Sequence, residues 1–331
     1  MRKLAVRRFA HEAMATIFEV IIAGKKTIYG RQAARAAFDE IERIERLFNR
    51  FDPSSEISRI SRLAPGDRLQ IGIETYECLA LAMQIQSETA GAFDVNYRAG
   101  GDRRVAKTRR PRSVNADMNG VRTAQPAGLR VRARPNLLAA PPLAASICLS
   151  TVPGGFAVTR RRSAKGRPPS LLDIDLGAVG KGYALDCAAA VLRDWDVDNA
   201  LLQAGTSTAL GTGPGPDPSA LDPGWPVGVA TSFPGIGVPS VLRLSGRALS
   251  GSGTEVKGPH IIDPRTGRPA RRALAAWAAH PSAAVSDALS TAFFVMSQAE
   301  VRAFCRRRPD VWALVIRGPK KCKIYPSGAA P

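Results

Sequence analysis

The sequence lacks a long uninterrupted apolar run. Its first apolar stretch, residues 13–24, is short and contains Glu19. A signal peptide needs an apolar core of roughly 7–15 residues, and a membrane-spanning helix needs about 20. We therefore expect no signal peptide, no lipid-anchoring leader and no membrane span, and we interpret residues 13–23 as a strand.

Cysteine and histidine are also scarce, with five and three residues in a chain of 331. The cysteines are Cys78, Cys148, Cys187, Cys305 and Cys322. No two of them have CxxC or zinc-ligand spacing, which predicts reduced thiols rather than a zinc site or a disulfide framework. Together with the missing leader, this pattern predicts a cytoplasmic protein.

Acidic residues are outnumbered, with 28 Asp and Glu against 47 Lys and Arg and a net charge of +19. The excess is concentrated in residues 98–167, which hold 16 basic and two acidic residues, or +14. This stretch has few aromatic residues and no recognisable nucleic-acid-binding module. We interpret it as a solvated basic insertion rather than as a surface for a specific nucleic acid.

Hydrophobic residues make up 45% of the chain, enough for one large core or two modest ones. Helical spacing of apolar residues predicts helices at 30–50, 75–89, 183–193, 285–297 and 298–307. Short apolar runs predict strands at 13–23, 171–176, 199–204, near 225–231, near 240–245 and at 311–316. Neither period is sustained through 98–170. We expect one domain over 1–331, with 98–170 as a basic, irregular insertion.

A glycine-rich loop, residues 177–182, joins a predicted strand to a predicted helix. Exposed backbone N–H groups and the helix dipole favour a phosphate at such a place, and Lys181 would add a cation. The spacing matches neither the P-loop nor the dinucleotide fingerprint. A tight turn is the alternative interpretation. A second glycine-containing segment, 250–253, is also expected to be a loop.

Asp287 and Thr291 lie four residues apart, which places both on one face of a helix, one turn from each other. One carboxylate, one hydroxyl and a loop carbonyl suit Mg²⁺ if a pyrophosphate supplies further oxygens. Ser286 and Asp287 equally suit a helix start. His260 lies in a loop, where functional groups gather, although a lone histidine is also common as a structural residue. Residues 263–267 predict a turn.

Six segments, in this order, resemble the FAD:protein FMN transferases of the ApbE family. They are MAT at 14–16, FDPSSEIS at 51–58, GAFDV at 91–95, DLGAVGKGYALD at 175–186, HIIDPRTG at 260–267 and SDALSTA at 286–292. The likeness covers 10–97 and 171–317, and the fourth and fifth segments are the most specific. The chain departs from the family at Ala15, at Thr206 and at 249–251.

The resemblance implies an α+β fold of mixed sheets with flanking helices, with FAD in a cleft and Mg²⁺ on its pyrophosphate. It implies Asp287, Thr291 and the backbone carbonyl of Ala178 as metal ligands. The residues for which it implies contacts with FAD are Met14, Ser55, Asp94, Lys181, Ser250 and Gly251. His260 falls at the family's catalytic histidine, and Asp287 is the second residue expected to be catalytic.

The reaction implied by the resemblance moves the FMN half of FAD onto a Thr or Ser hydroxyl of a target protein, as a phosphoester, and releases AMP. His260 would take the hydroxyl proton or stabilise developing charge. One alternative is a flavin-binding protein or FAD pyrophosphatase without transfer. Another is a nucleic-acid-binding protein that uses residues 98–167.

Overall fold

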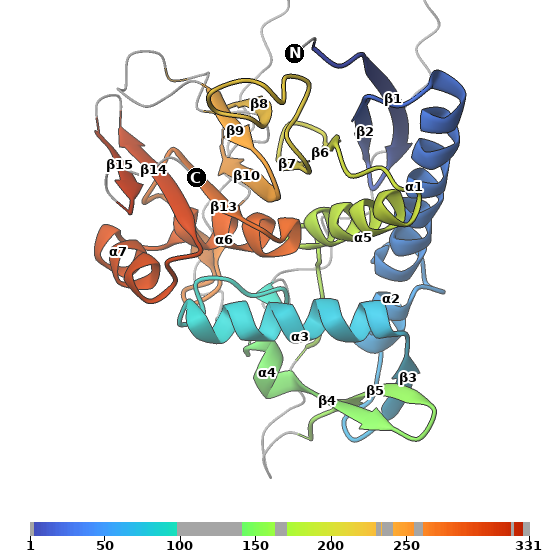
Figure 1. The fold of residues 1–331 in the computed structure, drawn as a ribbon. Coiled ribbons are helices and arrows are strands. Elements are labelled where there is room, and N and C mark those ends of the chain that lie inside the picture. The colour runs from blue at the N-terminus through green and yellow to red at the C-terminus, as the bar shows by residue number, and fades with distance from the viewer. Residues whose placement is uncertain are drawn as a thin grey trace, which may run out of the picture.

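The computed structural model describes residues 3–97, 141–162, 171–229, 233, 241–254, 261–318 and 321–326. These residues form one eight-stranded antiparallel sheet, a three-stranded sheet, two short hairpins and the helices that flank them (Figure 1). This combination confirms the predicted α+β class.

The large sheet brings together strands from both ends of the chain. In spatial order they are β1 (Val6–Ala13), β2 (Thr16–Ala23), β6 (Ala200–Ala204), β7 (Thr208–Gly211), β10 (Arg247–Gly253), β13 (Ala275–His280), β14 (Trp312–Gly318) and β15 (Lys321–Tyr325). Side chains alternate between its two faces, so Val20 and Ile22 join the core under the helices while Ile21 joins a second core. The hairpin of β8 (Trp225–Gly228) and β9 (Val241–Leu244) contributes Trp225 and Leu244 to that second core.

The strand predicted at 13–23 is wrong in its extent, because the chain reverses at Met14 and Ala15. Ala13 pairs with Thr16, which leaves a two-residue turn between β1 and β2. Both turn residues have positive φ angles, 49° and 57°. Glycine or asparagine usually marks such a turn. Neither is present here, so the residue types at this turn do not predict it.

The predicted helices are confirmed, with shifted ends. They are α1 (Thr27–Phe48), α3 (Ile73–Glu88), α5 (Gly180–Asp194), α6 (Ala283–Val295) and α7 (Gln298–Arg307), and a short α2 (Glu56–Ser61) follows α1. In α6, 12 of 13 residues are buried, because it packs on β10 and β13 and against α5 and α3. A helix surrounded in this way is apolar on nearly every side.

Part of the segment 98–170, expected to be irregular, has regular structure. Residues 141–162 form α4 (Leu143–Ser146) and the hairpin of β4 (Ile147–Val152) and β5 (Gly155–Arg160), and β5 pairs with β3 (Arg68–Ile71). Leu143, Ile147 and Val158 are buried in the main core. Residues 98–140 and 163–170 lie outside the described residues, and the assignment of the whole chain to one domain stays a prediction.

The strand predicted at 171–176 does not form. The backbone N–H of Asp173 donates to the side chain of Asn96 (2.9 Å), and that of Ile174 donates to the hydroxyl of Ser61 (3.2 Å). Because side chains take these donors, the segment joins none of the described sheets.

Two general features complete the fold. Within the parts of the chain that the structure describes, no helix combines the length and apolarity needed to cross a bilayer. None of the five cysteines, all of which the structure describes, is assigned to a disulfide, as predicted.

Candidate functional site

Helix α6 is fixed at its start by a carboxylate from α5. Asp186 accepts hydrogen bonds from the N–H groups of Ala283 (2.7 Å) and Ala284 (3.0 Å) and from the Ser282 hydroxyl (2.7 Å). The first N–H groups of a helix have no partner within the helix. Asp186 therefore satisfies them and ties α6 to α5. Burial raises the pKa of Asp186, and these hydrogen bonds oppose the rise.

Gly182 lets the two helix starts touch. A Cβ atom at this position would lie 2.2 Å from the carbonyl oxygen of Ala283, so only glycine fits. This close approach brings the first turn of α5, with Lys181, against α6.

Asp287 of α6 lies under that first turn, with 5% of its side chain exposed. Its Oδ2 atom lies 3.4 Å from Lys181 Nζ and accepts the Gly182 N–H at 3.3 Å. Both distances exceed the roughly 2.7–2.9 Å of tight charge-assisted bonds. Lys181 Nζ also donates to the Gly177 carbonyl at 2.6 Å. No described residue donates to Asp287 Oδ1, so this carboxylate keeps bonding capacity for a further ligand.

Thr291 lies one turn further along α6 and faces β10. The hydroxyl oxygen of Ser252, in β10, lies 3.1 Å from Thr291 Oγ1 and 2.8 Å from Ser290 Oγ. Thr291 is thereby oriented by the sheet on which α6 packs.

Residues 250–253, expected to be a loop, belong to strand β10, so that expectation is wrong. They pair with β13, and a Cβ on Gly251 would lie 2.6 Å from Nε1 of Trp277, which explains a glycine inside the strand. Ser250 is fully buried between the sheet and its neighbours. Its hydroxyl oxygen has no hydrogen-bond partner among the described residues.

The donors around Asp287 suit magnesium. The Asp287 carboxylate and the Thr291 hydroxyl lie one turn apart on α6. Ala178 belongs to the turn just before α5, and its carbonyl as a metal ligand stays a prediction. No group of three or more His, Cys, Asp or Glu side chains gathers in the part of the chain that the structure describes. One acid with neutral oxygens is the donor set that Mg²⁺ uses when a phosphate completes its shell. The residues present therefore fit this ion.

Met14 borders a separate hollow of about 410 Å³, lined by residues 12–17 and by Glu45 of α1. The Met14 side chain is half-buried against the main core. A Cβ on Gly205, which follows β6, would lie 2.4 Å from the Thr16 hydroxyl. The predicted contact of Met14 with FAD stays a prediction.

Ser55, a predicted FAD contact, is the N-cap of α2. Its hydroxyl accepts the Ser58 N–H at 3.1 Å and donates to the Asn49 carbonyl at 2.7 Å. Within the described residues, no hydrogen bond joins Ser55 to Lys181 or Asp287, so its contact with FAD stays a prediction.

Asp94, another predicted FAD contact, is buried where α3, the following loop and α4 meet. Its carboxylate accepts the N–H groups of Asn96 (2.8 Å) and Leu143 (3.3 Å) and the side-chain amide of Gln86. Burial raises the pKa of Asp94, while these hydrogen bonds lower it. The contacts present give Asp94 a structural role, and its contact with FAD also stays a prediction.

His260, the predicted catalytic histidine, lies outside the described residues, and the described chain resumes at Ile261. The turn predicted at 263–267 is confirmed. The Asp263 carbonyl accepts the N–H groups of Thr266 (3.1 Å) and Gly267 (2.9 Å). Arg265 bridges Asp263 (2.9 Å) and Glu300 of α7 (2.8 Å), which anchors the turn.

Comparison with known protein families gives a match to the ApbE family over residues 14–315. The chain belongs to the ApbE family. Two FAD:protein FMN transferases are similar in sequence. The one from Rhodobacter capsulatus is 33% identical over 135 residues, which cover 38% of this chain and 25% of that protein. The one from Treponema pallidum (strain Nichols) is 33% identical over 166 residues, which cover 46% of each. The match thus spans less than half of either relative.

Solved ApbE structures have the same fold. The Pseudomonas stutzeri flavinyl transferase ApbE in its apo form superposes with a TM-score of 0.68 at 17% identity, covering 98% of this chain and 96% of that one. The ApbE protein from Thermotoga maritima gives 0.71 at 23% identity, with 96% of both chains covered.

Two positioning residues of this ApbE protein were missed from sequence. Asp186 ends the segment 175–186 that resembles the family, but nothing in the sequence predicts that it caps α6. Arg50, at the end of α1, pairs with Asp173 (3.1 Å) and Asp175 (3.0 Å) and so holds the segment that leads into the 177–182 loop. The alternating acids at 173 and 175 can be recognised in the sequence. Their pairing with Arg50 cannot, because only the tertiary structure brings Arg50 to them.

Proposed function

We propose that this protein transfers the FMN half of FAD to a Thr or Ser hydroxyl of an acceptor protein. The observation that carries this is the contact of Lys181, at the start of α5, with Asp287, which shares a face of α6 with Thr291, in a chain of the ApbE family. The Lys181 cation, at a helix start, suits a pyrophosphate. A buried carboxylate and a hydroxyl suit the magnesium that would accompany it.

Each residue has a distinct task in this proposal. Lys181 turns from the Gly177 carbonyl to the phosphate oxygens and offsets their charge. Asp287, Thr291 and the Ala178 carbonyl hold the metal. When bound, magnesium withdraws charge from the pyrophosphate and so favours attack at phosphorus and departure of AMP.

The transfer balances without a further reactant. The acceptor oxygen forms a bond to the flavin-side phosphorus, while the bond from that phosphorus to the bridging oxygen breaks and AMP leaves. The hydroxyl proton must also be removed. His260 is our candidate, either as the base or as a stabiliser of charge, and a rate that rises with pH through about 6–7 would identify the base.

The test incubates the purified protein with FAD, Mg²⁺ and a Thr- and Ser-containing acceptor protein, and measures the FMN adduct and AMP by mass spectrometry. Asp287→Asn should slow adduct formation about a hundredfold or more, because it weakens the metal site. Asp198→Asn, at an exposed acid without a side-chain partner among the described residues, is the matched control and should retain activity.

Three outcomes would contradict the proposal. If Asp287→Asn were as active as the Asp198→Asn control, Asp287 would not be a metal ligand. FMN and AMP without an adduct would identify an FAD pyrophosphatase. FAD retained without turnover would identify a flavin-binding protein.

A further inference from the structure

A row of hydroxyl groups joins α6 to β10 beside Asp287. Ser252 Oγ, in β10, lies 2.8 Å from Ser290 Oγ and 3.1 Å from Thr291 Oγ1, both in α6. Ser290 Oγ in turn lies 2.9 Å from the backbone carbonyl oxygen of Asp287. These contacts all have hydrogen-bond length. Thr291 and Asp287, at the two ends of the row, are both expected metal ligands.

The positions of the protons in this row follow from the acceptor at its end. A backbone carbonyl oxygen only accepts, so the single hydroxyl proton of Ser290 is donated to Asp287. Ser290 Oγ therefore accepts in its contact with Ser252, and this contact uses the single hydroxyl proton of Ser252. The contact between Ser252 and Thr291 then takes its proton from Thr291. Donation thus runs in one direction, from the Thr291 hydroxyl to the Asp287 carbonyl.

Burial keeps this direction fixed. Ser290 is fully buried, and Ser252 and Thr291 are half-buried. If Ser252 donated to Thr291 instead, the Ser252 and Ser290 oxygens would face each other at 2.8 Å without a proton between them. The Thr291 proton would then also lack an acceptor among the described residues. Burying a polar group in this way is unfavourable.

The lone pairs of Thr291 Oγ1 are therefore left for a ligand. No described residue donates a hydrogen bond to this oxygen, because its one contact there is its own donation to Ser252. A divalent cation is bound through oxygen lone pairs, so a hydroxyl ligand must direct its proton elsewhere. A group that accepts the proton of a metal ligand fixes the orientation of that ligand and makes it a better donor of electrons.

We propose that Ser252 is a positioning residue, which accepts the Thr291 proton and so directs the Thr291 lone pairs toward a divalent cation. The inference rests on one part of the proposed function, namely that Thr291 is a metal ligand. Ser252 does not contact the cation and acts only through Thr291. Because the row ends at the Asp287 carbonyl, its direction does not depend on any group outside the fold.

The test measures binding of Mn²⁺ alone, without FAD, by electron paramagnetic resonance, since Mn²⁺ takes the same oxygen ligands as Mg²⁺. Ser252→Ala should bind Mn²⁺ about tenfold more weakly than wild type, because the Thr291 proton loses its acceptor. Thr291→Val replaces the hydroxyl by a methyl group and should bind at least as weakly. In the double variant, Ser252→Ala should add less than about twofold, because the hydroxyl through which it acts is already absent.

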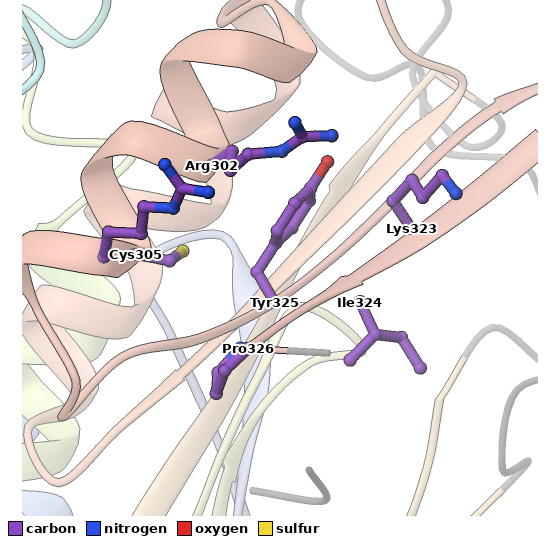
Figure 2. A pocket seen from close by; sticks show the side chains of 7 residues that line it. Arg302, Cys305, Lys323, Ile324, Tyr325 and Pro326 are labelled. Carbon is purple, nitrogen blue, oxygen red and sulfur yellow. The ribbon is translucent and has the colours of Figure 1, made fainter. Parts of the chain in front are cut away.

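Two control variants remove a hydroxyl without touching the row. Ser286, also in α6, is buried and donates to the Ala278 carbonyl of β13 at 2.7 Å, so Ser286→Ala loosens the helix on the sheet in a comparable way. Tyr325 lines a hollow between α7 and β15, where its ring extends toward Arg302 (Figure 2). Tyr325→Phe removes a hydroxyl from elements that contribute nothing to the row. Both variants should bind Mn²⁺ within about twofold of wild type.

A further variant keeps the test decisive if thermal unfolding shows that Ser252→Ala does not fold. Ser290→Ala removes the acceptor of the Ser252 proton, which then turns toward Thr291, so Mn²⁺ binding should weaken although Ser290 is no ligand. Wild-type affinity in a folded Ser252→Ala or in Ser290→Ala would overturn the proposal. So would equal weakening in Ser286→Ala, full additivity in the double variant, or no Mn²⁺ binding by wild type. If Mn²⁺ binds as expected but no FMN adduct forms, the proposed transfer alone fails.

Discussion

At position 287, a carboxylate lies on a helix whose other buried side chains are mostly Ala, Val, Leu and Phe. Burying a charge is unfavourable unless close partners compensate it. Lys181 at 3.4 Å and the Gly182 N–H at 3.3 Å compensate Asp287 incompletely. Incomplete pairing of this kind is characteristic of a residue retained for a ligand rather than for stability.

Ala15 offers a test of backbone strain in the β1–β2 turn. It has φ 57° and is exposed. A non-glycine residue in the left-handed region is strained by about 1–2 kcal/mol. Glycine removes this strain, but its greater conformational entropy in the unfolded chain lowers stability by roughly 0.5–1 kcal/mol. Ala15→Gly should therefore stabilise the protein by up to about 1 kcal/mol, measured by thermal or denaturant unfolding.

A matched control is available in the neighbouring strand. Ala10 is exposed in β1 with ordinary strand geometry, so Ala10→Gly should destabilise by about 0.5–1 kcal/mol. If Ala15→Gly destabilised the protein as much as Ala10→Gly, strain at the turn would be excluded.

At the residue scale, sequence predicted what depends on local spacing. Asp287 and Thr291 share a helix face, and Lys181 belongs to a glycine loop at a helix start, so their grouping could be expected. Gly182 and Asp186 could not be assigned roles in this way. Their functions depend on contacts with residues about a hundred positions later, which no local pattern encodes.

At the element scale, the orientation of α6 depends on Asp186. Asp186→Ala would leave the first N–H groups of α6 without acceptors. It should lower the free energy of unfolding by about 1–3 kcal/mol and reduce adduct formation, because Asp287 would be less well fixed. Asp194→Ala, at an exposed acid at the end of α5, is the control. Equal melting temperatures for the two variants would show that Asp186 does not anchor α6.

His280 makes the same region sensitive to pH. Its Nδ1 accepts the Ser282 N–H at 2.9 Å, and its Nε2 lies 3.0 Å from Asp310 Oδ2, which fits a neutral ring. Burial lowers the pKa of His280 from 6.5, although Asp310 opposes this. The unfolded chain therefore binds the proton more readily, and stability should fall as pH drops through 6.5.

Because one proton is involved, the free energy of unfolding can change by at most about 1.4 kcal/mol per pH unit. His280→Asn keeps an acceptor for the Ser282 N–H but cannot titrate. The free energy of unfolding of this variant should therefore change less between pH 7 and 5 than that of wild type, by no more than this limit allows. A wild-type slope in His280→Asn would exclude His280 as the titrating group.

Element prediction succeeded for helices and was weaker for strands. Helices α1, α3 and α7 show apolar spacing over several turns. Strand β13 (AAWAAH) was missed because alanines packed on both faces leave no alternation. The segment 171–176 has the composition of a strand, but loop and side-chain acceptors take its backbone donors. Strand formation depends on distant partners, whereas helix formation depends mainly on neighbours in sequence.

On the scale of the whole molecule, the residues that flank the basic segment 98–140 lie close together. Asn96 is buried, and its side-chain amide donates to the Pro141 carbonyl at 2.9 Å. The two positions that flank the segment are therefore held together by a buried side chain. Insertions with adjacent ends are tolerated well, because the entropy of closing a loop grows slowly with its length.

Replacing residues 98–140 by a four-residue Gly-Ser linker should therefore leave the fold and the proposed FMN transfer intact. The segment carries eleven basic and two acidic residues, so its removal lowers the net charge by nine. Wild type should bind a 20-base-pair DNA duplex weakly and lose this binding steeply as salt rises, since such contacts are independent of sequence. The shortened protein should bind the duplex at least about tenfold more weakly at low salt.

Anisotropy with labelled duplex, thermal unfolding and adduct formation measure duplex binding, folding and transfer separately. Duplex binding that survives raised salt would favour a nucleic-acid function. Loss of folding or transfer in the shortened protein would instead make the segment part of the catalytic domain.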